Sequence, residues 1–248
     1  MIVAASTECF PDLPLPDVYE KLVDLEYTGV EVSIDEEGPH LKPSEVHESL
    51  DKAIALCRDI HRLDMVAYKV APAPGPDYYD HFQACCRLAK ATKVASITVP
   101  SAELGTPFNE EVERLRKLVD LATEESIVVS IKSEIGCLTE DPATVVVLCD
   151  NVKGLGVALD PSHYVSGPHN KRGFDNLISY TYNVYLRDTS ESELQVRVGQ
   201  GEIDYGKLIN QLSREKYARA LTVHMEELPD VEHVAEMRKL RLLLESWL

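Results

Sequence analysis

The sequence predicts a (β/α)8 TIM barrel, and two observations point to this fold. Eight short apolar runs rich in β-branched residues recur along the 248-residue chain, as is typical of strands that are buried on both faces. The segments between them carry apolar residues at the three- and four-residue spacing of amphipathic helices. Strict alternation of strands and helices implies parallel strands with right-handed crossovers, so eight such units favour a closed barrel. A chain of this length is close to the usual size of one barrel.

The predicted strands follow one another without a Gly/Ser-rich linker or a low-complexity segment, so we expect residues 1–248 to form one domain. The strands are Ile2–Ala5, Val30–Ile34, Met65–Val70, Ser96–Val99, Ile127–Ile131, Gly156–Leu159, Asn183–Leu186 and Leu221–Val223. The alternative is a doubly wound open sheet. The first strand–helix turn does not favour it, because that turn lacks a GxGxxG motif.

Helix start signals lie between these strands. One helix opens at Pro43, and its apolar face consists of Val46, Leu50, Ile54, Cys57 and Ile60. The other predicted starts are Asn109 as a cap, Asp141 followed by Pro142, Asp204 as a cap, and Pro229 with Asp230 before the last helix.

The composition excludes several classes of partner. The 25 basic and 42 acidic residues give a net charge of −17, which repels phosphate backbones and anionic lipids, so we expect neither nucleic-acid binding nor membrane adsorption. The six cysteines form no CxxC pair, and several lie among apolar residues, as free thiols of a reduced compartment do. The N-terminus has no basic region, and no apolar stretch reaches the length of a membrane span. These features predict a cytoplasmic location.

In a barrel of this type, polar residues just past the C-terminal ends of the strands build the active site. Alternation along the later strands groups the polar residues by face. The groups are Ser130, Lys132 and Glu134 after the fifth strand; Asp160 and His163 after the sixth; Tyr185 and Arg187 at the end of the seventh; and Thr222, His224 and Glu226 at the end of the eighth. The third strand supplies Lys69, and the first supplies Glu8.

The segment Asp160-Pro161-Ser162-His163 is the most informative of these. A carboxylate that leaves a buried strand, with an imidazole three residues later, suits a metal or an acid–base pair. The alternative is a structural turn, in which Asp160 caps the turn and His163 bonds a backbone carbonyl.

Lys132 ends an otherwise apolar run and therefore needs a partner. It could polarise a substrate carbonyl, anchor an anion or form a Schiff base, or it could pair structurally with Asp160 or Glu134. His224 is either a ligand or base, or a structural histidine. Arg187 either pairs with Asp188 at the rim or grips a carboxylate or phosphate.

At these residues the chain resembles the xylose isomerase-like TIM-barrel superfamily, which includes sugar isomerases, ketose 3-epimerases, inosose dehydratases and endonuclease IV-type enzymes. The resemblance covers nearly the whole chain. Three motifs carry it: Gly154-Leu155-Gly156 leading to Leu159-Asp160-Pro161-Ser162-His163, then Val184-Tyr185-Leu186-Arg187-Asp188, and then Gly199-Gln200-Gly201-Glu202-Ile203-Asp204. The order and spacing of the motifs are specific for the superfamily but not for one reaction.

The resemblance implies a divalent metal (Mn, Zn, Mg or Co) held by a glutamate, an aspartate, a histidine and a glutamate on the fifth to eighth strands. These positions fall on Lys132, Asp160, Tyr185 and His224, so only the aspartate is in place. Two outcomes are open. Asp160, His163 and His224, with Glu134 or Glu226, form a rearranged two-histidine, one-carboxylate metal site. Otherwise the ammonium of Lys132 replaces the metal, while His163 or His224 moves the proton.

The resemblance implies a sugar isomerase or epimerase-like enzyme that moves a proton next to a carbonyl of a small keto-sugar or polyol. The expected catalytic residues are Asp160, His163, Lys132 and His224, and the expected substrate-binding residues are Glu134, Tyr185, Arg187 and Glu226. The alternatives are a metal-free lyase, dehydratase or hydrolase that uses Lys132, and a non-catalytic sugar-binding barrel. A DNA repair role is opposed by the charge of −17. Barrels of this group often pair, so a homo-oligomer is an open expectation.

Overall fold

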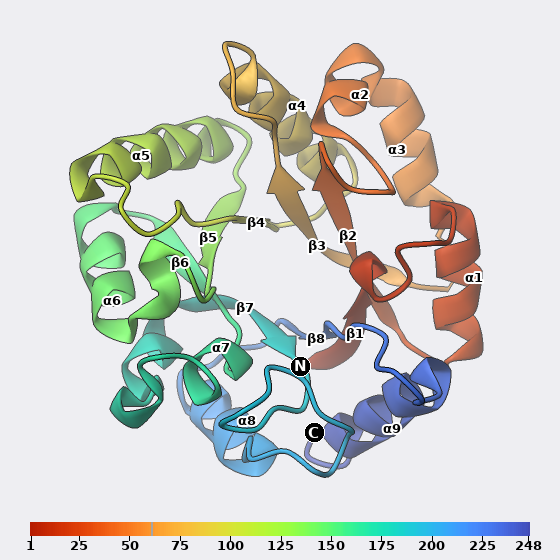
Figure 1. Cartoon of the computed structure of the whole chain (residues 1–248). Coiled ribbons are helices and arrows are strands. Elements are labelled where there is room, and N and C mark those ends of the chain that lie inside the picture. Colours follow the sequence, from red (N-terminus) through yellow and green to blue (C-terminus); the bar gives the residue numbers. More distant parts are fainter. Residues whose placement is uncertain (61) are drawn as a thin grey trace.

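A computed structural model, which describes residues 1–60 and 62–248, confirms the closed eight-stranded barrel (Figure 1). Neighbouring strands pair in parallel and in chain order, and the last strand pairs with the first through Ile2–Ala5 and Ala220–Val223. The strands are β1 (Ile2–Ser6), β2 (Gly29–Asp35), β3 (Asp64–Ala71), β4 (Ser96–Val99), β5 (Val128–Lys132), β6 (Leu155–Leu159), β7 (Thr181–Leu186) and β8 (Ala220–Val223).

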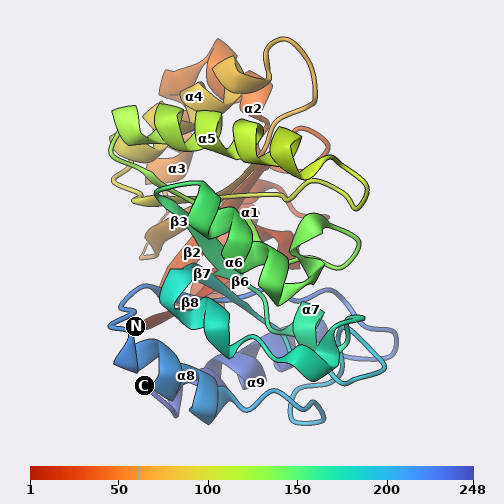
Figure 2. The same cartoon turned by 90° about the vertical axis from the view of Figure 1, so that its left-hand side faces the viewer.

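The helices cover the outside of the strands (Figures 1 and 2). The α-helices are α1 (Leu15–Asp24), α2 (Pro43–Glu48), α3 (Leu50–Arg58), α4 (Tyr78–Ala91), α5 (Phe108–Glu124), α6 (Pro142–Asn151), α7 (Ser162–Val165), α8 (Tyr205–Arg214) and α9 (His233–Glu245). Short 3-10 helices are η1 (Thr7–Cys9), η2 (Leu138–Glu140), η3 (Asn170–Arg172) and η4 (Asp175–Tyr180).

The local signals predicted some helix starts correctly and others wrongly. The Asp141 side chain accepts a hydrogen bond from the Ala143 amide, and Asp204 accepts one from the Lys207 amide, so both predicted caps are confirmed. The predicted helix from Pro43 is two helices, because Ser49 has a non-helical backbone (φ −147°, ψ 75°) that interrupts it. Asn109 is not a cap, since α5 already begins at Phe108.

The apolar core lies between the strands and the helices. One set of alternating strand residues, such as Val32, Ile97 and Leu221, packs outward into this core. The other set points into the barrel and is mostly small or polar. Hydrogen bonds among Glu31, Thr98, Asn183, Tyr185 and Thr222 join its members across the barrel. The barrel interior is therefore a polar layer in which each charged group needs a partner.

Two register shifts shape the barrel interior. Pairing skips Val66 between β2 and β3, and it skips Tyr182 between β6 and β7. Each skipped side chain lies against a glycine on the neighbouring strand: a Cβ on Gly29 would be 2.8 Å from Val66 Cγ1, and a Cβ on Gly156 would be 2.2 Å from the Tyr182 ring. These glycines leave the space that the two bulged side chains fill.

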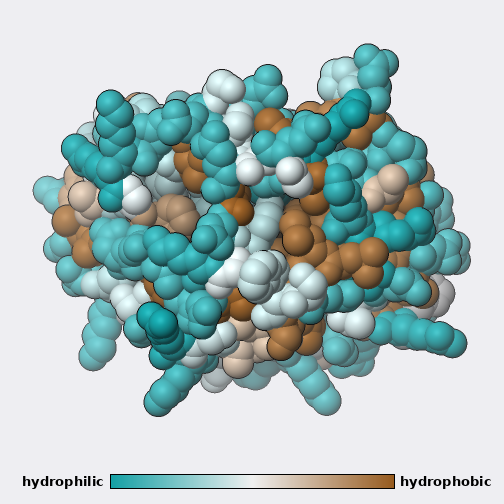
Figure 3. Space-filling model, turned by 90° about the horizontal axis from the view of Figure 1, so that it is seen from below, coloured by the Kyte–Doolittle hydropathy of each residue, from teal (hydrophilic) through white to brown (hydrophobic). Residues whose placement is uncertain are grey.

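No helix in the described part of the chain is long and apolar enough to cross a membrane. The face drawn in Figure 3 is mostly hydrophilic, with hydrophobic areas between the polar side chains.

We predict that Gly156→Ala lowers the free energy of unfolding by about 1–3 kcal/mol, because the new methyl group displaces the Tyr182 ring. Chemical denaturation of the variant checks this. In a Tyr182→Ala background the same substitution should cost little. An equal cost in both backgrounds would contradict the role of this contact.

Candidate functional site

The candidate site lies at the C-terminal end of the barrel, where β1, β3, β5, β6, β7 and β8 deliver charged side chains to a common rim. These side chains are Glu8, Lys69, Lys132, Asp160, Arg187 and His224, and His163 of α7 lies beside them. Asp160, Arg187, Lys132, His163 and His224 are all buried.

A chain of hydrogen bonds links four strands across this rim. Glu8 Oε2 lies 3.0 Å from His224 Nε2, and His224 Nδ1 lies 2.7 Å from Arg187 Nη2. The same Arg187 nitrogen donates to Asp160 Oδ2 at 2.9 Å. The guanidinium therefore connects the carboxylate of β6 to the imidazole of β8 through one nitrogen.

The partners of His224 determine its tautomer. Arg187 can only donate, so Nδ1 of His224 accepts, and the ring proton is on Nε2, where it is donated to Glu8. Burial lowers the pKa of His224 to about 4; the hydrogen bond to Glu8 opposes this, and the nearby charges of Arg187 and Lys132 reinforce it. His224 is thus neutral near pH 7, with both ring nitrogens engaged.

Glu8 is the anionic end of this chain. Its Oε1 accepts from Lys69 Nζ at 2.5 Å and from the Ser33 hydroxyl at 3.1 Å. Burial raises the pKa of the Glu8 carboxyl. The hydrogen bond from His224 and the charge of Lys69 outweigh that effect and hold the pKa well below its usual range.

Asp160 is fully buried and ionised. Its Oδ1 accepts from the amide of Ser162 at 3.1 Å and from the Ser162 hydroxyl. Burial acts to raise its pKa, but the charge of Arg187 and the hydrogen bond from Ser162 hold the pKa well below the usual range. The carboxylate of Asp160 therefore orients its neighbours and has no exposed surface of its own.

His163 presents one unengaged ring nitrogen. Its Nδ1 accepts from the Ile135 amide at 3.1 Å, so the ring proton is on Nε2. That nitrogen is buried, lies 3.5 Å from Asp160 Oδ2 and has no hydrogen-bond partner among the described residues. Burial lowers the pKa of His163, while the charge of Asp160 partly offsets this. His163 is therefore a neutral imidazole whose buried Nε2–H makes no hydrogen bond within the described residues.

Lys132 and Glu134 form a loose pair beside this imidazole. Lys132 Nζ lies 3.7 Å from Glu134 Oε1 and 5.9 Å from the centre of the Tyr185 ring. The side chain of Lys132 is 8% exposed and that of Glu134 is 35% exposed. Of the two pairings that the sequence left open for Lys132, the one with Glu134 is formed.

The structure also gives the surroundings of Arg187 and Glu226, which the sequence singled out at the rim. Arg187 pairs with Asp160 rather than with Asp188. Asp188 instead accepts from the amides of Gly199 and Gly201, which holds the loop after β7. Glu226, expected to contact substrate, is exposed on the loop after β8, where its backbone pairs with the Gln195 side chain.

Sequence reasoning did not select Glu31, Ser33 or Asp35 of β2. The signal was present, because these polar residues alternate with Val32 and Ile34 and so share the inward face. Asp35 Oδ2 lies 3.7 Å from Lys69 Nζ, and Ser33 bonds Glu8. β2 therefore contributes to the polar layer beneath the rim.

The residues around Asp160 do not fit a divalent metal. Arg187 Nη2 lies between Asp160 and His224 and uses the Oδ2 and Nδ1 lone pairs that a metal would need. The Nδ1 lone pair of His163 is taken by Ile135. Within residues 1–60 and 62–248, no group of three or more His, Cys, Asp or Glu side chains could hold a metal ion. The predicted site of Asp160, His163 and His224 is therefore not formed, because a protein cation occupies it.

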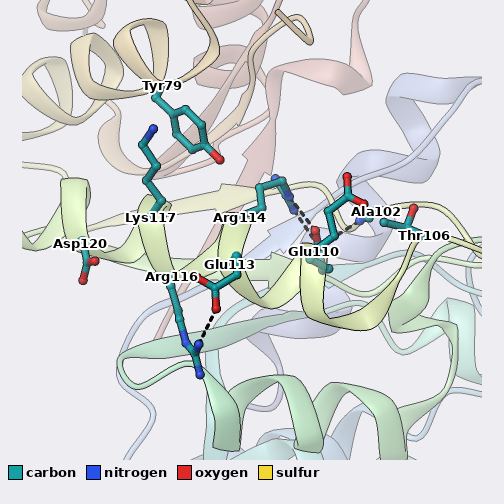
Figure 4. A pocket seen from close by; sticks show the side chains of 10 residues that line it. Tyr79, Ala102, Thr106, Glu110, Glu113, Arg114, Arg116, Lys117 and Asp120 are labelled. Atoms are coloured by element: carbon teal, nitrogen blue, oxygen red, sulfur yellow. Dashed lines mark hydrogen bonds and ion pairs between the residues drawn. The ribbon is translucent and has the colours of Figure 1, made fainter. Parts of the chain in front are cut away.

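A groove of about 790 Å³ lies along α5, outside the barrel, and Figure 4 shows the side chains that line it. Its three cationic groups have partners: Arg114 bonds Glu111, Arg116 bonds Glu113, and Lys117 lies over the Tyr79 ring. Since these cations are already engaged on a helix surface, the barrel rim is the better candidate for chemistry.

The model of one protein family, described as xylose isomerase-like TIM barrel, matches residues 19–243. This chain belongs to that family. The resemblance expected from the three motifs is thereby confirmed. No curated protein matches the sequence.

Solved structures similar to this xylose isomerase-like barrel share its fold at low sequence identity. The structure of a 3-keto-D-glucoside 4-epimerase from E. coli has a TM-score of 0.76 at 12% identity and covers 99% of each chain. A xylose isomerase-like TIM barrel protein from Mycobacterium smegmatis, in complex with magnesium, has a TM-score of 0.75 at 13% identity, covering 100% of this chain and 98% of the other. A D-allulose 3-epimerase from Methylomonas sp. has a TM-score of 0.76 at 10% identity with the same coverage.

We predict that His224 makes this xylose isomerase-like barrel acid-sensitive. Its pKa of about 4 lies below the unfolded value of 6.5, so unfolding takes up a proton and stability falls as the pH drops from 6.5 towards 4. Between pH 7 and 4 the wild type should lose on the order of 3 kcal/mol more unfolding free energy than His224→Gln. Denaturant titrations at several pH values measure this difference, and parallel curves for the two proteins would rule the effect out.

Proposed function

We propose that the protein is a sugar isomerase or epimerase-like enzyme that moves a proton next to the carbonyl of a small keto-sugar or polyol. One observation carries the proposal: the N–H of His163, the ammonium of Lys132 and the half-buried carboxylate of Glu134 lie together at the rim of the barrel. Similar structures include those of a D-psicose 3-epimerase and an L-ribulose 3-epimerase, which support this class of reaction.

In this proposal Lys132 and His163 polarise the substrate carbonyl. Removing a proton from the adjacent carbon places negative charge on the carbonyl oxygen, and two donors in a mostly buried site stabilise that charge. A single donor of this kind typically contributes about 3–4 kcal/mol to transition-state stabilisation. A neutral imidazole can act as such a donor because its Nε2–H needs no ionisation.

Glu134 is the proposed base. His163 and His224 are held as Nε2–H tautomers whose Nδ1 atoms already accept hydrogen bonds, so neither imidazole has a lone pair to take a proton. Glu134 has a carboxylate that is partly exposed and only loosely paired with Lys132. It would take the proton from the substrate carbon and return it to the former carbonyl carbon, giving isomerisation, while the hydroxyl proton passes to the other oxygen. Epimerisation would instead need a proton from a second donor on the opposite face of the same carbon.

The chain Glu8–His224–Arg187–Asp160 has a positioning role in this proposal. Asp160 holds Arg187 and faces the N–H of His163, while Glu8 and Arg187 fix the two nitrogens of His224. Tyr185 completes the buried wall beside Lys132. Asp160 lies beside His163 and Tyr185 lies beside Lys132, so the chain would keep the reacting groups in a defined geometry.

The proposed reaction does not route through a metal at Asp160. The guanidinium of Arg187 and the ammonium of Lys132 supply the positive charge at the rim, and a divalent ion next to both would be repelled. This misfit also favours, as a second candidate, a metal-free dehydratase that begins with the same proton abstraction. One similar structure is that of a probable 3-DHS dehydratase.

We predict that the protein exchanges a substrate proton for deuterium in D2O, at the carbon next to the carbonyl, with a chelator present. Lys132→Met should slow this exchange by about 10²-fold or more, because the developing oxyanion loses a donor. Nuclear magnetic resonance of a panel of ketoses measures the exchange, and it distinguishes isomerised product from loss of water.

The exposed Lys153 supplies the matched control, since Lys153→Met removes the same charge away from the rim. Undiminished exchange in Lys132→Met would contradict the proposed role of Lys132, and loss of exchange on chelation with recovery on adding Mn²⁺ would contradict the metal-free reaction. Binding of a ketose without exchange or dehydration would favour a sugar-binding barrel.

We predict that Asp160→Asn abolishes exchange, since His163 and Arg187 lose the carboxylate that orients them. The variant should still fold, with an unfolding free energy lower by about 3 kcal/mol because the guanidinium is left unpaired. Circular dichroism and denaturation check the fold. Ser162→Ala, which removes only one of the hydrogen bonds to Asp160, should retain most activity. Full activity in Asp160→Asn would remove Asp160 from the mechanism.

A further inference from the structure

A second carboxyl group, Glu31, lies in the barrel interior beneath the rim. It is completely buried on β2. Its Oε2 accepts two hydrogen bonds, one from Asn183 Nδ2 at 2.6 Å and one from the Tyr185 hydroxyl at 2.9 Å. Its Oε1 is buried without a partner among the described residues.

A carboxyl group at this position lowers the stability of the fold. A buried carboxylate oxygen without a hydrogen bond destabilises the folded state, whereas an amide or an apolar side chain of similar size would carry no charge. The neighbouring interior positions hold Thr98, Ser130 and Thr222, which fill the barrel with neutral side chains. The choice of glutamate therefore calls for a role beyond packing.

Tyr185 connects Glu31 to the candidate site. Its hydroxyl points to Glu31, and its ring is fully buried. The ring centre lies 5.4 Å from that of His224 and 5.9 Å from Lys132 Nζ. Glu31 holds the Tyr185 hydroxyl and thereby fixes the orientation of the tyrosine ring beside Lys132 and His224.

We propose that Glu31 is a positioning residue for the rim: it fixes the phenol of Tyr185, and the tyrosine ring in turn holds Lys132 and His224 in place. Its effect on turnover rests on the proposed function of that site. The coupling between Glu31 and Tyr185 is a property of the fold and does not depend on the proposed function.

The electrostatics of Glu31 provide a readout that a packing role would not produce. Burial raises its pKa to about 7, although the hydrogen bonds from Tyr185 and Asn183 oppose the rise. Glu8 raises the pKa further and Lys69 lowers it. The other titratable groups that feel its charge are Cys9 and Tyr217.

The sign of the resulting pH dependence follows from these values. The folded pKa of about 7 lies above the ordinary value of 4.5 for a glutamate, so the unfolded chain releases this proton first and stability falls as the pH rises from 4.5 through 7. Glu31→Gln keeps the size and an acceptor oxygen but cannot ionise. Relative to this variant, the wild type should lose stability over that range; the contribution of His224 is common to both proteins and cancels.

The decisive experiment is a double-mutant cycle of Glu31→Met and Tyr185→Phe, with Glu31→Gln as a further single variant. Tyr185→Phe removes only the hydroxyl. We expect Glu31→Met and Tyr185→Phe each to lower kcat for proton exchange about 10-fold with KM little changed, and the double variant to lower it no further. Glu31→Gln should retain more activity than Glu31→Met and lose the limb of the pH–rate profile near pH 7. Ser96→Ala, a buried position at the end of β4 away from the rim, is the control that should leave kcat unchanged.

Unfolding free energies of the same variants keep the test independent of turnover. Non-additive losses of stability for Glu31→Met and Tyr185→Phe would support the coupling, as would a pH dependence of stability that Glu31→Gln removes. If these results are obtained but no substrate is turned over, only the proposed function fails. Additive losses, or a kcat that is unaffected by Tyr185→Phe in an active enzyme, would overturn the inference.

Discussion

The rim of this barrel depends on one buried ion pair, that between Arg187 and Asp160. Both groups are almost completely shielded from water, so either one alone would be an uncompensated charge. The same Arg187 nitrogen also meets His224, which makes the guanidinium the link between β6, β7 and β8. The tautomer of His224 follows from its contact with Arg187, and the paired Asp160 lies 3.5 Å from Nε2 of His163.

The ion pair also determines which chemistry the rim can perform. Where a divalent metal would require free oxygen and nitrogen lone pairs, Asp160 and His224 already accept hydrogen bonds from a protein cation. The groups outside this chain of hydrogen bonds are His163, whose Nε2–H has no partner among the described residues, and the loose pair of Lys132 and Glu134. Such a set suits charge developing on a carbonyl oxygen, with a carboxylate beside it to carry the proton.

Beneath the rim, the barrel is filled by a polar layer rather than by the bulky aliphatic side chains that dominate many barrel interiors. Hydrogen bonds from Asn183 and Tyr185 to Glu31 span the barrel, and the bulges at Val66 and Tyr182 fill the space left by Gly29 and Gly156. A polar layer with few alternative pairings is rigid, because each rearrangement would leave a buried group unsatisfied. The rim above it is therefore held from below as well as from the side.

Periodicity and local chemistry were enough to predict the eight strands, and their alternation with helices predicted the barrel. The same reasoning predicted the caps at Asp141 and Asp204. It also predicted the strand-end positions of Lys132, Asp160 and His224, because each of these features depends on residues close together in the chain. The pairing of the charged side chains could not be predicted in this way. Arg187 is adjacent to Asp188 in sequence but bonds Asp160, and Glu226 shares a strand face with His224 yet lies in solvent. Which charges meet across a barrel depends on strand register and on how far each chain runs past its strand. Only the tertiary structure decides these, because the partners come from segments dozens of residues apart whose contact energies no local pattern encodes.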